Sequence, residues 1–187
     1  MSAAGRKTKA DFSGPSDAAV LALIAEGDIA ALSSLYDRYA PGLLRFASRL
    51  VGTQDAPDIV QSAFLRVVGL ARGYDASFPS ARSWLYGIVV RVIREHRRSL
   101  HRWASTLLKL AAQPAKATVS ISEARPDLDA CLSQLTLPKR TVLLLSEVEG
   151  FTNEEIATML SIPIGTVWTR LHHARRELRQ LYHEDDP

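Results

Sequence analysis

The chain has little of what would place it outside the cell or within a membrane. Its single cysteine, Cys131, leaves no partner for an internal disulfide, which fits a reducing compartment and a small buried side chain on a helix. No run of about 18 consecutive apolar residues occurs, so the sequence predicts no membrane-spanning helix and no direct membrane insertion. The opening stretch MSAAGRKTKADFSG lacks the apolar core of a signal peptide. We therefore expect a cytoplasmic protein in which residues 1–15 form a flexible tail.

Strand signals are also scarce, whereas apolar residues make up 47% of the 187 residues and recur with helical spacing. This pattern predicts an all-α protein with two small helical domains. The first block covers 16–100 and the second 126–183, with a tail at 184–187. Residues 101–125 between them lose the clear periodicity, and the stretch AAQPAKATVSISEARP is small, polar and bounded by proline. We interpret this segment as a flexible linker with room for a short helix at 102–111.

Cap and turn residues divide the two blocks into helices. Pro41 is expected to bend or break a helix after Tyr39, 72–80 reads as a loop, and the last helix of the first block should reach roughly Ser99. Three residues, Ser16, Asp28 and Ser80, are predicted to cap helix starts, and Asp55 is predicted to begin a further helix. The second block predicts helices near 126–135, 138–148, 153–160 and 165–182.

Positive charge is concentrated in two places although the formal net charge is only +3. Residues 82–102 hold six arginines against one glutamate, and a second basic cluster lies at 170–179. Two separate arginine-rich helices indicate a polyanionic partner, most often nucleic acid. The competing interpretation is that both are simply solvated helix faces, and charge alone does not decide between them.

The second block contains the pattern of a helix-turn-helix. Thr152 and Glu155 fit a capping box at the start of a short helix, Ser161-Ile162-Pro163 form the turn, and a longer helix begins at Gly165. At 100° per residue, the apolar residues of the longer helix fall within about 40° of one line. They are Val167, Leu171, Ala174, Leu178 and Leu181.

The opposite face of this helix is polar. Thr169, His172 and Arg176 point away from the apolar line, with Trp168, His173 and Arg179 beside them. Such a face suits the DNA major groove, which admits a helix and offers acceptors on guanine. The alternative is a helical hairpin whose charged outer face meets only water.

The stretch GFTNEEIATMLSIPIGTVWTRLHHARRELR resembles the region-4 helix-turn-helix of bacterial sigma factors of the extracytoplasmic-function (ECF) group. LSQLTLPKRTVLLLSEVEG, just upstream, also resembles that family. Two positions depart from the family pattern: Trp168 replaces a common lysine or arginine, and His173 replaces a common arginine. The resemblance implies recognition of the promoter −35 element, and the candidate residues are Thr166, Trp168, Thr169, Arg170, His172, His173 and Arg176.

In the first block, ALSSLYDRYAPGLLRFASRLVG and DAPDIVQSAFLRVV resemble regions 2.1–2.2 of the same family. On a helical wheel Val60, Phe64 and Val67 form the inward line, and Leu65 lies outward among acidic and amide groups. The resemblance implies that this surface binds a coiled coil of the RNA polymerase clamp. The candidate core polymerase-binding residues are Asp55, Asp58, Gln61, Ser62 and Leu65.

The stretch ARSWLYGIVVRVIREHRRS resembles regions 2.3–2.4, with Arg91 at a usual asparagine and Glu95 at a usual aspartate. Arginine pairs with phosphate, and aromatic rings stack on unpaired bases. For Trp84 two assignments stand, stacking on a base or packing in the core, and core packing is the better one. The loop 73–80 corresponds to the family's base-capturing loop. The candidates for −10 recognition and melting are Phe78, Trp84, Arg91, Arg94 and Arg98.

Together these resemblances imply an ECF sigma factor, with region 2 at 16–100 and region 4 at 126–183. It is expected to bind core RNA polymerase and the −10 and −35 elements of promoter DNA, and to have an anti-sigma partner. We expect no enzyme activity and no cofactor or metal. The first alternative is a helix-turn-helix regulator that acts without polymerase. The second is an enzyme whose metal would be held by His96, His101, His172, His173 or Cys131, although neither HExxH nor CxxC spacing occurs.

Overall fold

The computed structural model describes residues 15–74, 78–110 and 128–183, and within them the chain is helical with no strand. The predicted tails fall almost wholly at 1–14 and 184–187, and most of the predicted linker falls at 111–127. These parts, like 75–77 of the predicted loop, lie outside the described residues. The all-α prediction is confirmed for the rest.

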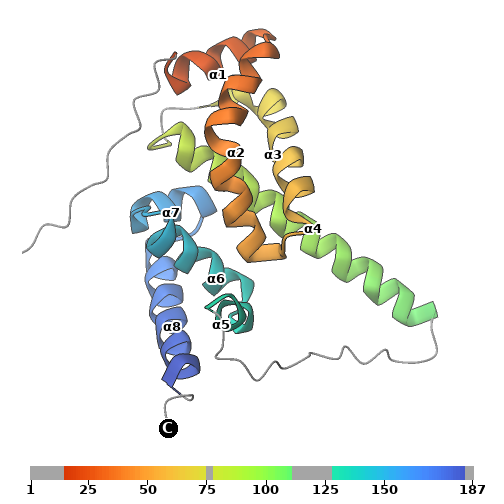
Figure 1. Cartoon of the computed structure of the whole chain (residues 1–187), viewed down its shortest axis with the longest axis vertical. Coiled ribbons are helices and arrows are strands. Elements are labelled where there is room, and N and C mark those ends of the chain that lie inside the picture. Colours follow the sequence, from red (N-terminus) through yellow and green to blue (C-terminus); the bar gives the residue numbers. More distant parts are fainter. Residues whose placement is uncertain (1–14, 75–77, 111–127, 184–187) are drawn as a thin grey trace, which may run out of the picture.

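The first domain is a bundle of α1 (Asp17–Glu26), α2 (Ala30–Val51), α3 (Ala56–Leu70), a 3-10 turn η1 (Ala71–Gly73) and α4 (Ala81–Leu110). Figure 1 shows α1 across one end of the bundle, with α2 and α3 side by side against α4. The apolar line of each helix turns inward, as the periodicity predicts, and its members are almost fully buried. They include Leu43, Phe46, Val60, Phe64, Val67, Leu85 and Val89.

The three predicted caps are present. The Ser16 hydroxyl accepts from the backbone of Ala19, Asp28 accepts from that of Ala30 at 2.9 Å, and the Ser80 hydroxyl accepts from that of Ser83 at 3.1 Å. Asp55 precedes α3 as expected, but its side chain caps nothing. Its carboxylate instead lies 3.4 Å from His96 Nε2 of α4.

Two predicted helix ends are wrong. Helix α2 continues through Pro41 to Val51, because buried residues on both sides, such as Ala40 and Leu43, hold it in place although proline removes one backbone hydrogen bond. Helix α4 runs to Leu110 rather than Ser99. Residues 100–110 contain no glycine or proline to end it, and the periodicity fades there only because the helix has passed the end of the core.

The second domain contains α5 (Leu128–Gln134), α6 (Leu137–Leu143) with a π-helical turn η2 (Leu144–Val148), α7 (Asn153–Leu160) and α8 (Ile164–His183). Both bonds of the predicted capping box are made between Thr152 and Glu155. Gly150, before α7, has a φ of +74°, which a residue without Cβ adopts without strain. On α8, Val167, Leu171 and Ala174 are buried as predicted, and Cys131 is fully buried on α5.

The two domains are packed against each other. Helix α7 lies on α4, α5 and α6 lie near α2, and the buried residues of both domains form one apolar cluster. In Figure 1 the last half of α4 projects away from this packed body. The arrangement brings the two basic helices, α4 and α8, into one assembly.

Candidate nucleic-acid interface

Helix α8 presents the predicted polar face to solvent. Trp168 is 56% exposed, and Thr169, His172 and Arg176 are exposed on the same side. The Thr169 hydroxyl donates to the carbonyl of Gly165 at 2.9 Å, so its hydrogen is already used within the helix. The rings of His172 and His173 meet edge to face with centroids 5.6 Å apart. This face combines an indole, two imidazoles and a guanidinium, which can donate to base edges or phosphates.

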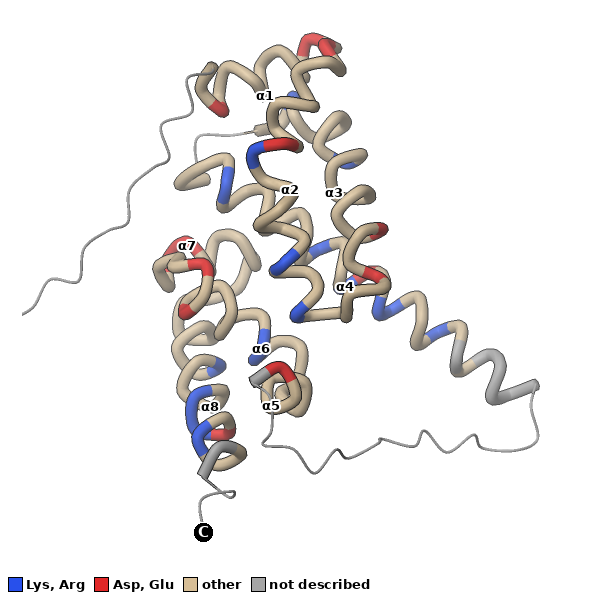
Figure 2. The backbone as a smooth tube through the Cα atoms, in the orientation of Figure 1, with Lys and Arg blue, Asp and Glu red and all other residues tan. Residues whose placement is uncertain are grey.

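The other flank of α8 is fixed to its own domain. Arg175 donates through Nε to Glu147 Oε1 at 3.0 Å, and Glu177 pairs with Lys139 of α6. These ion pairs and the buried apolar line hold the helix at one rotation about its axis. Figure 2 shows basic residues along α4 and α8 and also on α2, and acidic residues on α7 and also on α1 and α3. Arg175, which matches the family pattern, therefore serves structure here.

Three arginines in the middle of α4 differ from Arg82 of the same helix, which pairs with Glu149. Arg91 and Arg98 are exposed and Arg94 is half-buried, and none of the three forms an ion pair within the part of the chain that the structure describes. A groove of about 890 Å³ runs beside them, between α4 and the start of α6. It is lined by Arg94, Arg97, Arg98, His101, Arg102, Thr136, Leu137 and Pro138. The guanidinium groups of Arg94 and Arg98, which line this open groove, are suited to a polyanion.

Arg170 lies on the flank of α8 that faces α4, and it is half-buried. The pKa of Arg94 is lowered first by burial and then by the positive charges of Arg170, Arg98 and Arg91. A −35 candidate and a −10 candidate are therefore neighbours in this arrangement. The remaining −35 candidate, Thr166, lies half-buried in the first turn of α8.

The structure corrects the inclusion of Trp84 among the −10 candidates. Its side chain is only 6% exposed, and its ring packs edge-on against Tyr74 with centroids 5.2 Å apart. No face of the ring is free to stack on a base, so core packing is the right assignment. Phe78 also packs against the core, but it stays partly exposed.

The outward face of α3 is arranged as the helical wheel predicts. Leu65 is 67% exposed, Asp58 and Gln61 are exposed, and Ser62 is half-buried. Sequence reasoning missed Tyr36 of α2, which is 43% exposed and packs on Phe64 with ring centroids 4.8 Å apart. No local pattern could have found it, because the contact joins two helices. Exposed apolar and aromatic side chains on two neighbouring helices, α2 and α3, are typical of a protein-binding surface.

Sequence reasoning also missed the residues that join the two domains. Arg82 of α4 donates to the Glu149 carboxylate at 2.8 Å and to the Glu149 carbonyl at 3.0 Å. The Tyr86 hydroxyl donates to the same carboxylate, and its pKa is raised by burial and then by Glu149. Phe151 lies under Arg82, 4.2 Å from ring centroid to guanidinium carbon, and edge-on to Tyr86.

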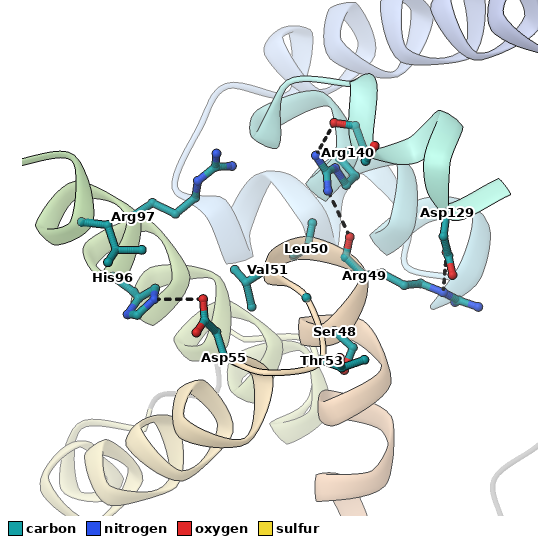
Figure 3. A pocket seen from close by; sticks show the side chains of 13 residues that line it. Ser48, Arg49, Leu50, Val51, Thr53, Asp55, His96, Arg97, Asp129 and Arg140 are labelled. Atoms are coloured by element: carbon teal, nitrogen blue, oxygen red, sulfur yellow. Dashed lines mark hydrogen bonds and ion pairs between the residues drawn. The ribbon is translucent and has the colours of Figure 1, made fainter. Parts of the chain in front are cut away.

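A second junction lies at the far end of α2, around a pocket of about 510 Å³ (Figure 3). Arg140 of α6 donates to the backbone carbonyl of Arg49 at 3.3 Å and to those of Ser133 and Leu135. One guanidinium therefore satisfies carbonyls at the ends of helices from both domains. The Arg49 side chain lies 3.9 Å from the Asp129 carboxylate of α5.

Two further classes of site are not found in the described residues. None of their helices is both long and apolar enough to cross a membrane. In the same part of the chain, no cluster of three or more histidine, cysteine or acidic side chains could hold a metal ion.

Comparison with known proteins gives matches over both domains. The family model described as "Sigma-70 region 2" matches residues 35–104, and "Sigma-70, region 4" matches residues 125–178. The chain is 33% identical over 165 residues to the protein named ECF RNA polymerase sigma factor SigL of Mycobacterium tuberculosis, covering 86% of this chain and 93% of that protein.

Two solved structures share the fold. One is that of CnrH in complex with the cytosolic domain of CnrY, with a TM-score of 0.64 at 24% identity over 91% of this chain and 99% of the other. The second is the sigma factor RpoE of Bartonella quintana in complex with the anti-sigma factor NepR, with a TM-score of 0.64 at 22% identity over 84% of this chain and 100% of the other.

Proposed function

The chain belongs to the ECF group of sigma-70 factors, which direct RNA polymerase to promoters, and from this premise we propose which of its surfaces carries out each step. The second domain, 126–183, recognises the −35 element through the exposed face of α8. The observation that carries this assignment is the opposition on one helix of buried Val167, Leu171 and Ala174 to exposed Trp168 and His172. A helix seated this way in a helix-turn-helix can enter a major groove.

The first domain, 16–100, acts on the −10 element. Arg91, Arg94 and Arg98 would pair with phosphates of the strand that leaves the duplex, and partly exposed Phe78 is the aromatic candidate for an unstacked base. Trp84 supports α4 from within the core instead.

The face of α3 binds core polymerase. Leu65 supplies the exposed apolar centre, and Asp58, Gln61 and Ser62 supply a polar rim. Asp55 lies at the edge of this surface and is paired with His96 of α4. Its main role is therefore to orient the start of α3, and contact with the polymerase is secondary.

A protein inhibitor is the expected further partner. Two solved structures of the same fold are complexes with a second protein, and in the RpoE complex that protein is named an anti-sigma factor. The chain itself carries out no covalent chemistry and acts in the cytoplasm, where the polymerase works. RNA synthesis belongs to the polymerase that it recruits.

The decisive experiment is run-off transcription with purified core RNA polymerase, this chain and a genomic promoter library. Discrete transcripts that require the chain are expected, with a shared −35 and −10 pattern upstream of their starts. If the chain binds DNA but forms no complex with core polymerase, the rival function, a regulator that acts without polymerase, replaces this one.

A further inference from the structure

The pocket at the second junction brings together arginines from both domains (Figure 3). Its volume of about 510 Å³ falls in the range of small-molecule binding sites. Arg49 of α2 and Arg97 of α4 line it from the first domain, and Arg140 of α6 lines it from the second. The pocket is therefore complete only while the two domains are packed together, an arrangement that we call the closed state.

Direct contacts elsewhere between the domains give this pocket defined walls. A Cβ added at Gly87 of α4 would lie 3.2 Å from the carbonyl oxygen of Met159, near the end of α7. A side chain at this position would crowd that oxygen, so the glycine lets the two backbones lie close together. The Glu149 carboxylate, which accepts from Arg82 and Tyr86, joins the domains nearby. Together these contacts hold the domains in one relative position.

The guanidinium group of Arg140 is held in place but not neutralised. It donates to three backbone carbonyls, through Nη1 to that of Arg49 and through Nη2 to those of Ser133 and Leu135. Carbonyls are uncharged acceptors, and Arg140 forms no ion pair with any residue that the structure describes. A guanidinium group has five N–H hydrogens. One on Nη1 therefore remains for a ligand, and the Nε hydrogen is buried without a partner among the described residues.

Arg97 adds a second cation to the same space. It is exposed, and it makes no ion pair or hydrogen bond within the described part of the chain. The pKa of Arg140 is lowered first by burial and then by the positive charge of Arg97. An anion placed between these two like charges would replace their repulsion by attraction to a shared partner.

Two carboxylates also line the pocket, and both are engaged. Asp55 lies 3.4 Å from His96 Nε2, and Asp129 lies 3.9 Å from Arg49 Nε. Three guanidinium groups against two carboxylates leave a surplus of positive charge in the pocket. Part of the wall is apolar, and it is formed by Leu50, Val51 and Leu100.

We propose that this pocket binds a small phosphate-bearing metabolite, whose phosphate lies between Arg97 of the first domain and Arg140 of the second. Arginine is suited to this role because its planar fork donates paired hydrogen bonds to phosphate oxygens. The pocket is larger than one phosphate group, and its apolar wall has room for an uncharged part such as a nucleoside. Because the ligand contacts both domains, it binds the closed state and raises its population.

The first test uses the full chain and three probes: inorganic pyrophosphate, adenosine diphosphate (ADP) and adenosine. Calorimetric titration at an ionic strength of about 0.15 M limits diffuse attraction to the basic surfaces of the chain. We expect saturable binding of one pyrophosphate or one ADP per chain, and no binding of adenosine. Tighter binding of ADP than of pyrophosphate identifies an organic phosphate as the ligand, and equal binding identifies the inorganic anion.

Two neighbouring arginines provide a matched pair of variants. Arg97 lines both this pocket and the groove beside α6, whereas Arg98 lines the groove alone. Both side chains are exposed, so neither Arg97→Gln nor Arg98→Gln should affect folding. Arg97→Gln is expected to weaken pyrophosphate binding about tenfold or more. Arg98→Gln should leave that binding nearly unchanged.

Asp129→Asn should have the opposite effect. It removes a carboxylate from the pocket and releases Arg49, at little cost in stability because this ion pair is long and exposed. Pyrophosphate binding is therefore expected to tighten severalfold. The control is Asp37→Asn, which removes an exposed charge of α2 outside the pocket and should change nothing.

Interdomain energy transfer tests whether the ligand contacts both domains. Glu149→Lys weakens the other junction, so that open chains become numerous enough to measure. Pyrophosphate at about ten times its dissociation constant for the closed chain should then raise the ratio of closed to open chains about elevenfold.

The proposal is overturned if neither phosphate probe binds saturably or if adenosine binds as tightly as ADP. Equal loss from Arg97→Gln and Arg98→Gln would place the anion in the neighbouring groove, and equal affinity of the Asp129→Asn and Asp37→Asn chains would place it away from α5. A closed fraction that ignores pyrophosphate would confine the contact to one domain. Each of these results contradicts a site between Arg97 and Arg140, and none bears on promoter recognition, which run-off transcription tests.

Discussion

Arg94 of α4 and Arg170 of α8 belong to different domains, yet they lie close enough across the seam between the domains for their like charges to interact. Burial and then the charge of Arg170 lower the pKa of Arg94, which shows that the seam disfavours a second cation there. The junctions at Glu149 and Arg140 hold the domains together against this repulsion. The closed state is therefore balanced between attraction and repulsion.

Removal of one of these charges should tighten the closed state. Arg170→Gln is expected to raise the closed fraction of the free chain, measured by interdomain energy transfer at low salt, where charge repulsion is least screened. Arg175→Gln removes the same charge from a residue that is paired with Glu147, and should leave the closed fraction nearly unchanged. A more open Arg170→Gln chain would mean that Arg170 attracts the first domain.

The outward face of α3 should be required for polymerase binding. Asp58→Arg with Leu65→Arg places two cations on an exposed surface, so the helix content by circular dichroism should be retained while core binding is lost. The matched control is Glu26→Arg with Leu23→Arg, an exposed pair on α1. Core binding that survives the α3 changes removes this face from the proposed function.

The arginines of α4 should act on strand opening rather than on assembly. A chain with Arg91, Arg94 and Arg98 replaced by alanine is expected to bind core polymerase normally yet leave promoter thymines weakly reactive to permanganate. A template with a premelted bubble should restore much of the transcription, because it no longer requires the step in which these side chains capture a separated strand. Absence of rescue by the bubble assigns the arginines to another step.

Different residues on the exposed face of α8 should contact the DNA bases and the DNA backbone. His172→Ala and Trp168→Ala are each expected to relax preference at one −35 position, at a cost of about 1–3 kcal/mol there. Arg176→Ala, two turns further along, should weaken all promoters alike and reduce the salt slope by about 1. Selection of −35 variants measures the first effect, and salt titration the second. Unchanged preference in both the His172 and Trp168 variants would favour recognition of DNA shape over direct reading.

Local features were predictable from the sequence because their causes are local. The capping box joins residues three apart, and the buried line of α8 follows from spacing alone. The same reasoning misplaced the end of α4. No glycine or proline ends the helix before Leu110, and no regular spacing of apolar residues marks the segment as helical. It favoured core packing for Trp84 yet kept the residue among the −10 candidates, since an aromatic residue at the edge of a helix face is compatible with both roles.

The junction between the domains had almost no sequence signal. Arg82 and Glu149 are 67 residues apart, and neither differs in pattern from an exposed charged residue. Gly87 offered a signal that the sequence analysis did not use, because a glycine inside a helix often marks a close approach of another backbone. What it approaches depends on the packing of the whole chain, which only the structure supplies.

The projecting half of α4 and the residues after it limit the distance between the two domains. From Arg94 to Leu110 the helix contributes about 24 Å at 1.5 Å per residue. Residues 111–127, whatever their conformation, add at most about 60 Å before α5 begins at Leu128. Together these segments set the greatest distance at which an opened chain can hold α5 from the arginines of α4.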